Sequence, residues 1–260
     1  DTVLIMDKLP IYDIHGIPFE VNAESGELIY HRSGTLALEF RAMKDMGTHY
    51  LAYFDTKRHQ LVGYRGMRPE FVEVKIPQMV ELDPRGVAKM YTIDVSQLPG
   101  RDSELRCESE LFRQRKSGKQ PIIDIYGYTY FVKLAFDMLE PKDFTKAGIS
   151  LWDMLRPRFG SGYRFMFDTV DQRLIRKKER QNPEALRGRA VWVNIPHVSV
   201  LDPYIFQGFH RREGTPDMLR FPIRYNLKAR IFDLDGKEIP SYKIGKRRSA
   251  PPKKKKGLTG

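Results

Sequence analysis

Three side chains in the first half of the chain have the types and spacing of a metal-dependent hydrolytic site. Asp55 is followed by the triplet Glu73-Val74-Lys75, which lies in a segment predicted to be a strand. Two such carboxylates can hold Mg²⁺, and a neighbouring lysine can assist the attack of a bound water. Asp55 and Glu73 are therefore candidate metal ligands, and Asp55, Glu73 and Lys75 form the candidate catalytic set.

This arrangement resembles the Asp…Glu-x-Lys pattern of restriction-type nucleases, which implies Mg²⁺ as a cofactor. The corresponding positions in the second half of the chain are Trp192 and Asn194, so only the first half could be active. A strand that alternates Val-Glu-Val-Lys with one face in water explains the same residues. The nuclease is therefore an alternative hypothesis. No catalytic residue and no cofactor is favoured, and the balance is against an enzyme.

A second pair of residues suggests a different hydrolytic chemistry. Asp55-Thr56 and Asp168-Thr169 each follow a predicted strand, and they resemble the paired Asp-Thr-Gly loops of aspartic proteases. The glycine that such a loop needs is replaced by Lys57 in one copy and by Val170 in the other. We therefore interpret both aspartates as residues that close a turn.

Other common chemistries have no support in the sequence. Cys107 is the only cysteine, which excludes an internal disulfide and a cysteine-rich zinc site. The six histidines form no His-Glu-x-x-His pattern, and no glycine-rich phosphate loop is present. No apolar run is long enough to span a bilayer, and we expect no signal peptide. A cytoplasmic location is expected, or a nuclear one if the chain is eukaryotic.

Basic side chains are the strongest functional signal. Arginine and lysine contacts to phosphates, with aromatic rings available for stacking, are typical of nucleic-acid binding. The chain carries a net charge of +12, of which eight positive charges lie in residues 243–260. The candidate nucleic-acid-binding residues are Arg173, Arg176, Lys177, Lys178, Arg180, Arg187, Arg189, Arg211, Arg212, Lys246, Arg247, Arg248, Lys253, Lys254, Lys255 and Lys256.

An internal duplication organises these residues. Three blocks recur in the same order: residues 11–16 match 122–127, residues 50–61 match 163–174, and residues 76–84 match 195–203. The first block returns once more at 231–236. The shared residues are mainly turn aspartates, glycines, prolines and apolar positions, which are the residues that a fold requires.

Each copy is predicted to have the order ββ(β)-α-β-β-α, with antiparallel sheets and hence an α+β class. An x-Gly turn closes the opening hairpin, and Asp13, Asp124 and Asp233 precede the three turns. Helices are expected over residues 36–46 and 151–159, and again after Asp83-Pro84 and Asp202-Pro203. The charged linker is expected to be partly helical around residues 104–115.

The predicted domains are module copy 1 (7–95), a charged linker (96–117) and module copy 2 (118–212). A third hairpin (219–240) is added to copy 2, and a disordered basic tail (241–260) follows. The favoured function is a non-enzymatic nucleic-acid-binding or assembly factor. The alternatives are the single-copy nuclease and a protein-interaction scaffold in which hairpins offer edges for strand addition. The expected partners are nucleic acid, bound through its phosphates, and a protein; no membrane partner is expected.

Overall fold

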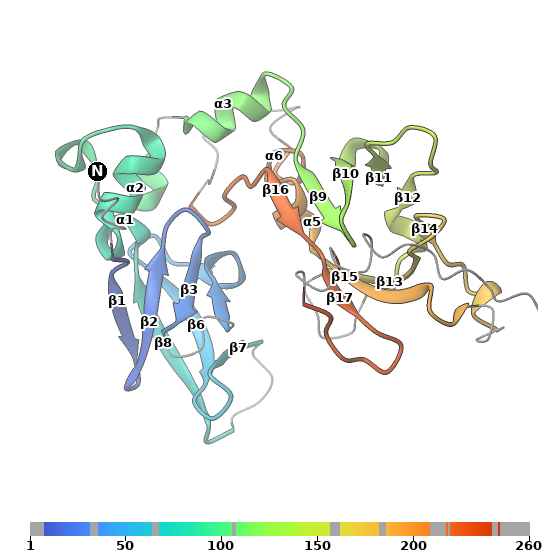
Figure 1. Ribbon diagram of the computed structural model, residues 1–260. Helices are drawn as coiled ribbons and strands as arrows, with labels where there is room; N and C mark the ends of the chain where they lie inside the picture. The colour runs from blue at the N-terminus through green and yellow to red at the C-terminus, as the bar shows by residue number, and fades with distance from the viewer. Residues whose placement is uncertain are drawn as a thin grey trace, which may run out of the picture. The chain divides into compact units, whose positions relative to one another are not determined.

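The computed structural model describes residues 8–31, 36–63, 68–105, 108–156, 162–181, 186–208, 217, 219–240 and 244. The chain divides into two compact units. The first comprises Asp1–Lys119 and Gln207–Ile223, and the second comprises Gln120–Phe206 and Arg224–Gly260. Both units combine sheets with short helices, as expected for an α+β protein (Figure 1). Over the described ranges, no helix has the length and apolar character needed to cross a membrane.

The first unit opens with a four-stranded antiparallel sheet in sequence order. Its strands are β1 (Ile11–Ile14), β2 (Ile17–Asn22), β3 (Glu27–Tyr30) and β4 (Ala37–Glu39). A second sheet is built around β6, which pairs with three other strands. Its strands are β5 (Lys44–Asp45), β6 (His49–Asp55), β7 (Gln60–Val62) and β8 (Phe71–Pro77).

Short helices complete the first unit. They are α1 (Met79–Leu82), α2 (Pro84–Tyr91) and α3 (Glu110–Lys116), and Figure 1 shows α1 and α2 at the end where β8 stops. The Asp83 carboxylate accepts a hydrogen bond from the N–H of Gly86, and Pro84 occupies the first turn of α2. The predicted cap-and-proline start of this helix is therefore confirmed.

The second unit has a similar succession of strands, with an isolated bridge between Leu155 and Arg164 where the first unit has β5. Its first sheet contains β9 (Ile122–Ile125), β10 (Tyr128–Lys133), β11 (Met138–Pro141) and β12 (Ile149–Ser150). Its second sheet contains β13 (Gly162–Asp168), β14 (Arg173–Leu174) and β15 (Ala190–Pro196), with β13 in the centre. Two short helices follow, α5 (Val198–Leu201) and α6 (Pro203–Phe206).

The segment after residue 223 adds one strand to each sheet of the second unit. β16 (Asn226–Lys228) runs parallel to β9, and β17 (Arg230–Phe232) runs antiparallel to β15 (Figure 1). A turn at residues 233–237 then returns the chain to a single bridge between Phe232 and Glu238. The prediction of an edge hairpin over 219–240 is therefore wrong. The segment contributes one strand to each of the two sheets, and β16 pairs in parallel with β9.

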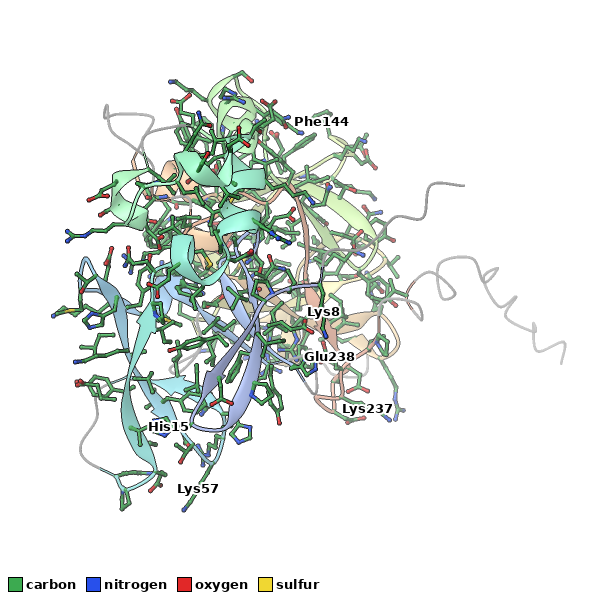
Figure 2. All side chains as sticks on the ribbon, turned by 90° about the vertical axis from the view of Figure 1, so that its left-hand side faces the viewer. Lys8, His15, Lys57, Phe144, Lys237 and Glu238 are labelled. Atoms are coloured by element: carbon green, nitrogen blue, oxygen red, sulfur yellow. The ribbon has the colours of Figure 1, made fainter. Side chains whose placement is uncertain are left out.

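Aspartate carboxylates close the opening hairpins, as predicted. Asp13 Oδ1 accepts from the N–H of Gly16 at 2.7 Å, and Asp124 Oδ1 accepts from Gly127 at 2.9 Å. His15 and Tyr126 have positive φ angles, as do the glycines that follow them. Two consecutive residues with positive φ are typical of the turn type that suits a two-residue hairpin. Figure 2 shows His15 at the tip of its hairpin.

Each unit has an aromatic core between its two sheets. In the first unit, Phe19 of β2 contacts Phe54 of β6 edge to face, with ring centroids 6.1 Å apart. In the second unit, Tyr130 of β10 and Phe167 of β13 make the corresponding contact at 6.4 Å. All four side chains are fully buried, so these rings join the two sheets of each unit.

The helices expected over residues 36–46 and 151–159 do not form. Residues 37–39 are a strand, residues 40–42 are a single 3-10 turn, and residues 44–45 are again a strand. In the second unit only Leu151–Asp153 forms a 3-10 turn, and residues 157–161 lie outside the described part. Leu38 and Phe40 are both buried, which is a spacing of two residues and therefore that of a strand. The helical segment expected within the linker is present as α3.

Gly26 gives a direct test of how residues 219–222 pack in the first unit. Its φ is +66°, and an added Cβ would lie 2.8 Å from the carbonyl oxygen of Leu219. Gly47 has a φ of +81° but open space around it. Alanine at either position costs about 1–2 kcal/mol for the left-handed backbone, and at Gly26 a further ~1–3 kcal/mol because the contact must open.

We therefore expect Gly26→Ala to lower the free energy of unfolding more than Gly47→Ala. Urea titration followed by far-ultraviolet circular dichroism measures both variants. Equal losses would show that residues 219–222 do not pack on Gly26.

Candidate nucleic-acid interface

The basic segment after β13 is anchored on the outer face of the second sheet. Ile175 is fully buried against Met166 of β13 and Ala190 of β15, with Leu186 and Trp192 packed beside them. Met166 and Trp192 are cross-strand partners on the face opposite the main core. The segment is therefore held in place by a small apolar cluster of its own.

Glu179 organises the first part of this segment. Its two carboxylate oxygens accept from the guanidinium of Arg173 at 2.6 and 3.0 Å, and Oε2 also accepts from the N–H of Arg176 at 2.8 Å. The bidentate bond from Arg173, together with this N–H, lowers the pKa of Glu179 to about 2. Arg173 is thereby neutralised within the fold.

Asp168 organises the second part. Its Oδ1 accepts from the N–H groups of Val170 and Asp171, both at 3.0 Å, and its Oδ2 accepts from Arg189 at 2.5 Å. Burial opposes ionisation of this carboxyl, but the bonds from Arg189 and the two N–H groups outweigh it, and its pKa is lowered. Arg189 also donates to the Asp171 carboxylate at 2.6 Å, so two carboxylates neutralise its charge.

Trp192 lies between two guanidinium groups. The guanidinium carbon of Arg164 is 4.6 Å from the Trp192 ring centroid, and that of Arg180 is 5.6 Å away. Arg180 also donates from Nε and Nη2 to the carbonyl oxygen of Ile175, at 3.3 and 3.2 Å. Arg180 is therefore used to fasten the segment to the sheet.

Three consecutive basic side chains remain available for an external anion. Arg176, Lys177 and Lys178 are all exposed on the turn that precedes Glu179, and we call them the basic turn. Among the described residues, no acceptor bonds to any of these three side chains. Arg187 is also exposed but has an interaction of its own. The structure thus separates the predicted cluster into compensated arginines and the basic turn.

The other predicted binding residues cannot be placed. Arg211 and Arg212 lie outside the described part of the chain, as do the seven tail residues Lys246, Arg247, Arg248, Lys253, Lys254, Lys255 and Lys256. Within residues 241–260 only Ile244 is described, and its side chain is buried in the core of the second unit. A variant that lacks the basic tail should therefore keep Ile244.

The candidate nuclease residues fall into two places. Glu73 and Lys75 are exposed on β8 and line an open hollow of about 230 Å³ together with Asp13 and His15. Asp55 does not line this hollow: it is buried, and its Oδ1 accepts from the N–H groups of Lys57 and Arg58, both at 2.9 Å. The Arg58 N–H in particular keeps the pKa of Asp55 low, so its carboxylate is used to close the turn.

Metal binding has no geometric support in the described residues. Over those ranges, no three side chains of His, Cys, Asp or Glu converge to hold an ion. Glu39, a further acid of the first unit, is on β4 and pairs with Arg41. Glu73 and Lys75 face the hollow without Asp55, the other carboxylate of the candidate metal site.

Sequence reasoning missed the residues that hold the basic segment in place. Glu179 is one acid in a basic stretch, and nothing in its spacing shows that it binds Arg173. Trp192 carried a usable signal, because it alternates with the apolar residues Val191 and Val193 and must face the other side of the strand.

Neither the protein-family models, nor the curated proteins, nor the solved structures include a match to this chain. Its function is therefore inferred from the geometry of the chain itself.

The role of Glu179 predicts a specific acid sensitivity. Because its pKa in the folded chain is about 2 against an ordinary value of 4.5, its contribution is complete above pH 4.5 and disappears as the pH falls toward 2. In a Trp152→Phe background, Trp192 fluorescence should change over this interval, since Arg180 leaves the ring as the segment loosens.

At neutral pH, the Trp192 fluorescence of the Glu179→Gln variant should resemble that of the Trp152→Phe protein at acid pH. The change in fluorescence as the pH falls from 4.5 toward 2 should be smaller in this variant. Glu140→Gln, which removes an acid paired with Lys133 on the other sheet, serves as the matched control. A Glu179→Gln protein with an unchanged titration curve would refute the anchoring role.

Proposed function

We propose that this chain is a non-enzymatic nucleic-acid-binding protein built from two copies of one module. The second copy contacts phosphates through the basic turn, and the basic tail adds sequence-independent attraction. The observation that carries the proposal is the basic turn itself: three adjacent exposed cations on a segment that is anchored by Ile175 and Glu179. A fixed cluster of cations contacts phosphates at a lower entropic cost than a free loop.

Matching hydrogen bonds support the duplication. Asp55 and Asp168 close the same turn with the same pair of backbone donors. The hydroxyls of Thr56 and Thr169 donate to the carbonyl oxygens of Glu70 and Arg189, which precede β8 and β15. Such agreement in polar contacts outside the apolar core is expected if one module was copied.

The basic turn follows β14 in the second copy. The equivalent segment after β7 in the first copy is described only as far as Gly63 and again from Arg68. The proposal therefore rests on the anchored cations of the second copy.

We expect the chain to bind a fluorescein-labelled single-stranded oligonucleotide, with an affinity that falls as salt rises. Replacing Arg176, Lys177 and Lys178 together by alanine should reduce the slope of log K against log salt by about 2. The matched control replaces Lys142, Lys228 and Lys237, which are exposed on the same unit. Fluorescence anisotropy measures both variants.

If the control triple variant lost as much of the salt slope, the loss would be due to net charge alone. That result would overturn the assignment of the basic turn. A variant that ends at Gly245 keeps Ile244 but lacks the tail, and it should retain binding that depends on the basic turn. Binding that vanishes altogether in this shortened chain would place the function in the tail alone.

The non-enzymatic part of the proposal is tested with supercoiled plasmid in the presence of Mg²⁺ or Mn²⁺. We expect no nicking, because Asp55 is committed to its turn and does not reach the hollow at Glu73. Nicking that is lost in Glu73→Ala but kept in Glu140→Ala would establish the nuclease instead.

A further inference from the structure

The first unit binds one of its own carboxylates in a specific slot. Asp102 accepts from the hydroxyl of Tyr50 at 2.5 Å and from the N–H groups of Met79 and Val80 at 2.8 and 2.9 Å. Its own N–H donates to Oε1 of Gln78 at 2.9 Å. A tyrosine from β6 and the start of α1 thus hold an aspartate from the segment after α2.

The second unit contains the same framework. Tyr163 pairs with Ile195 across β13 and β15, as Tyr50 pairs with Ile76 across β6 and β8. Pro196 ends β15 just as Pro77 ends β8. The N–H groups of Val198 and Ser199 at the start of α5 therefore correspond to those of Met79 and Val80 at the start of α1. His197 takes the place of Gln78, and its ring is stacked against Tyr163 at an interplanar angle of 8°.

No aspartate fills this second slot among the described residues. Tyr163 is only 5% exposed, and within the described part of the chain its hydroxyl has no hydrogen-bond partner. The N–H of Ser199 bonds to Nδ1 of His197 at 3.2 Å, which caps the short helix from within. Its oxygen is not among the buried side-chain atoms that lack a partner in the described part of the chain, so it remains open to water, and a ligand oxygen can take the place of that water.

The residue that lies beside the tyrosine on the neighbouring strand segment changes sign between the two slots. In the first unit Asp45 lies on β5, beside Tyr50, and its negative charge contributes, after burial, to the raised pKa of Asp102. Arg156 occupies the corresponding position in the second unit. Its guanidinium carbon is 5.6 Å from the Tyr163 ring centroid and 5.9 Å from that of Trp152. The positive charge of Arg156 therefore favours an anion at the second slot.

The surfaces around the two slots also differ. In the first unit Arg220 covers this region: it donates to the carbonyl oxygen of Met43 at 2.7 Å, and its guanidinium lies 5.9 Å from the Tyr50 ring. In the second unit Trp152 is 74% exposed and Phe136 is 75% exposed. The carboxylate of Asp137, the residue after Phe136, accepts from the Trp152 indole N–H at 3.2 Å and so orients the Trp152 ring.

We propose that Phe136, Trp152, Arg156 and Tyr163 form a docking surface for an acidic segment of a partner protein. A carboxylate of that segment accepts from the Tyr163 hydroxyl and the N–H of Val198, as Asp102 does from Tyr50 and Met79. Apolar side chains that flank the carboxylate cover Trp152 and Phe136, in the way that Leu105 is buried three residues after Asp102. This site is independent of the basic turn and of nucleic-acid binding.

A peptide taken from the chain itself is a suitable probe. Residues 98–105, Leu-Pro-Gly-Arg-Asp-Ser-Glu-Leu, contain Asp102 and Leu105. In full-length Trp192→Phe protein, Trp152 is the only tryptophan and reports on the docking surface. We expect a saturable change in its fluorescence on addition of the end-blocked peptide up to about 1 mM. A peptide with Asn in place of Asp102 should bind about tenfold more weakly.

Substitutions in the protein test each residue of the docking surface. Tyr163→Phe and Arg156→Gln should each weaken peptide binding several-fold, and Phe136→Ala should do the same through lost apolar contact. Phe144→Ala is the matched control, since Phe144 is also 75% exposed in the same unit but belongs to the loop after β11 (Figure 2). Tyr50→Phe controls for the first slot and should leave the Trp152 signal unchanged.

Several results would overturn the proposal. They are the absence of a saturable signal at low salt, equal binding of the Asp and Asn peptides, and full binding by Tyr163→Phe. An oligonucleotide that displaces the peptide and is itself weakened by Tyr163→Phe would assign the slot to phosphate rather than to protein.

Discussion

A buried carboxylate at the end of each long central strand sets the geometry on which the rest of both units depends. Asp55 ends β6 and Asp168 ends β13, and each accepts two backbone N–H groups from the turn that follows. His59 and Gln172 then adopt a positive φ and start the return strand. The turn fixes the strand register, and the register decides which side chains enter the core and which face the other way.

Contacts within the fold occupy most of the described arginines in the basic segment after β13. Arg173, Arg180 and Arg189 bind Glu179, Trp192 and Asp168, so they stabilise the segment instead of serving a ligand. The result is a defined placement of the basic turn. A cluster of like charges is unfavourable by itself, and the acids beside it lower that repulsion while leaving three side chains exposed.

The two units have different surfaces around similar local arrangements. The tyrosine and the helix start that hold Asp102 in the first unit recur in the second with an arginine and exposed aromatic rings around them. Arg41 of the first unit forms an ion pair with Glu39, whereas Trp152 at the corresponding position is exposed. Positions outside the core are free to change because the strand register does not depend on them.

Local patterns in the sequence predict the turns, the strand pairs of the hairpins and the capped helix at Asp83-Pro84, because these depend on neighbouring residues. The prediction of a helix over residues 36–46 is wrong, because Leu38 and Phe40, two residues apart, are both buried. The fold, and no local pattern, fixes which arginines are neutralised, that Asp55 lies apart from the hollow at Glu73, and that one segment adds a strand to each of two sheets. These outcomes depend on contacts between residues far apart in the chain, and no local pattern encodes such distances.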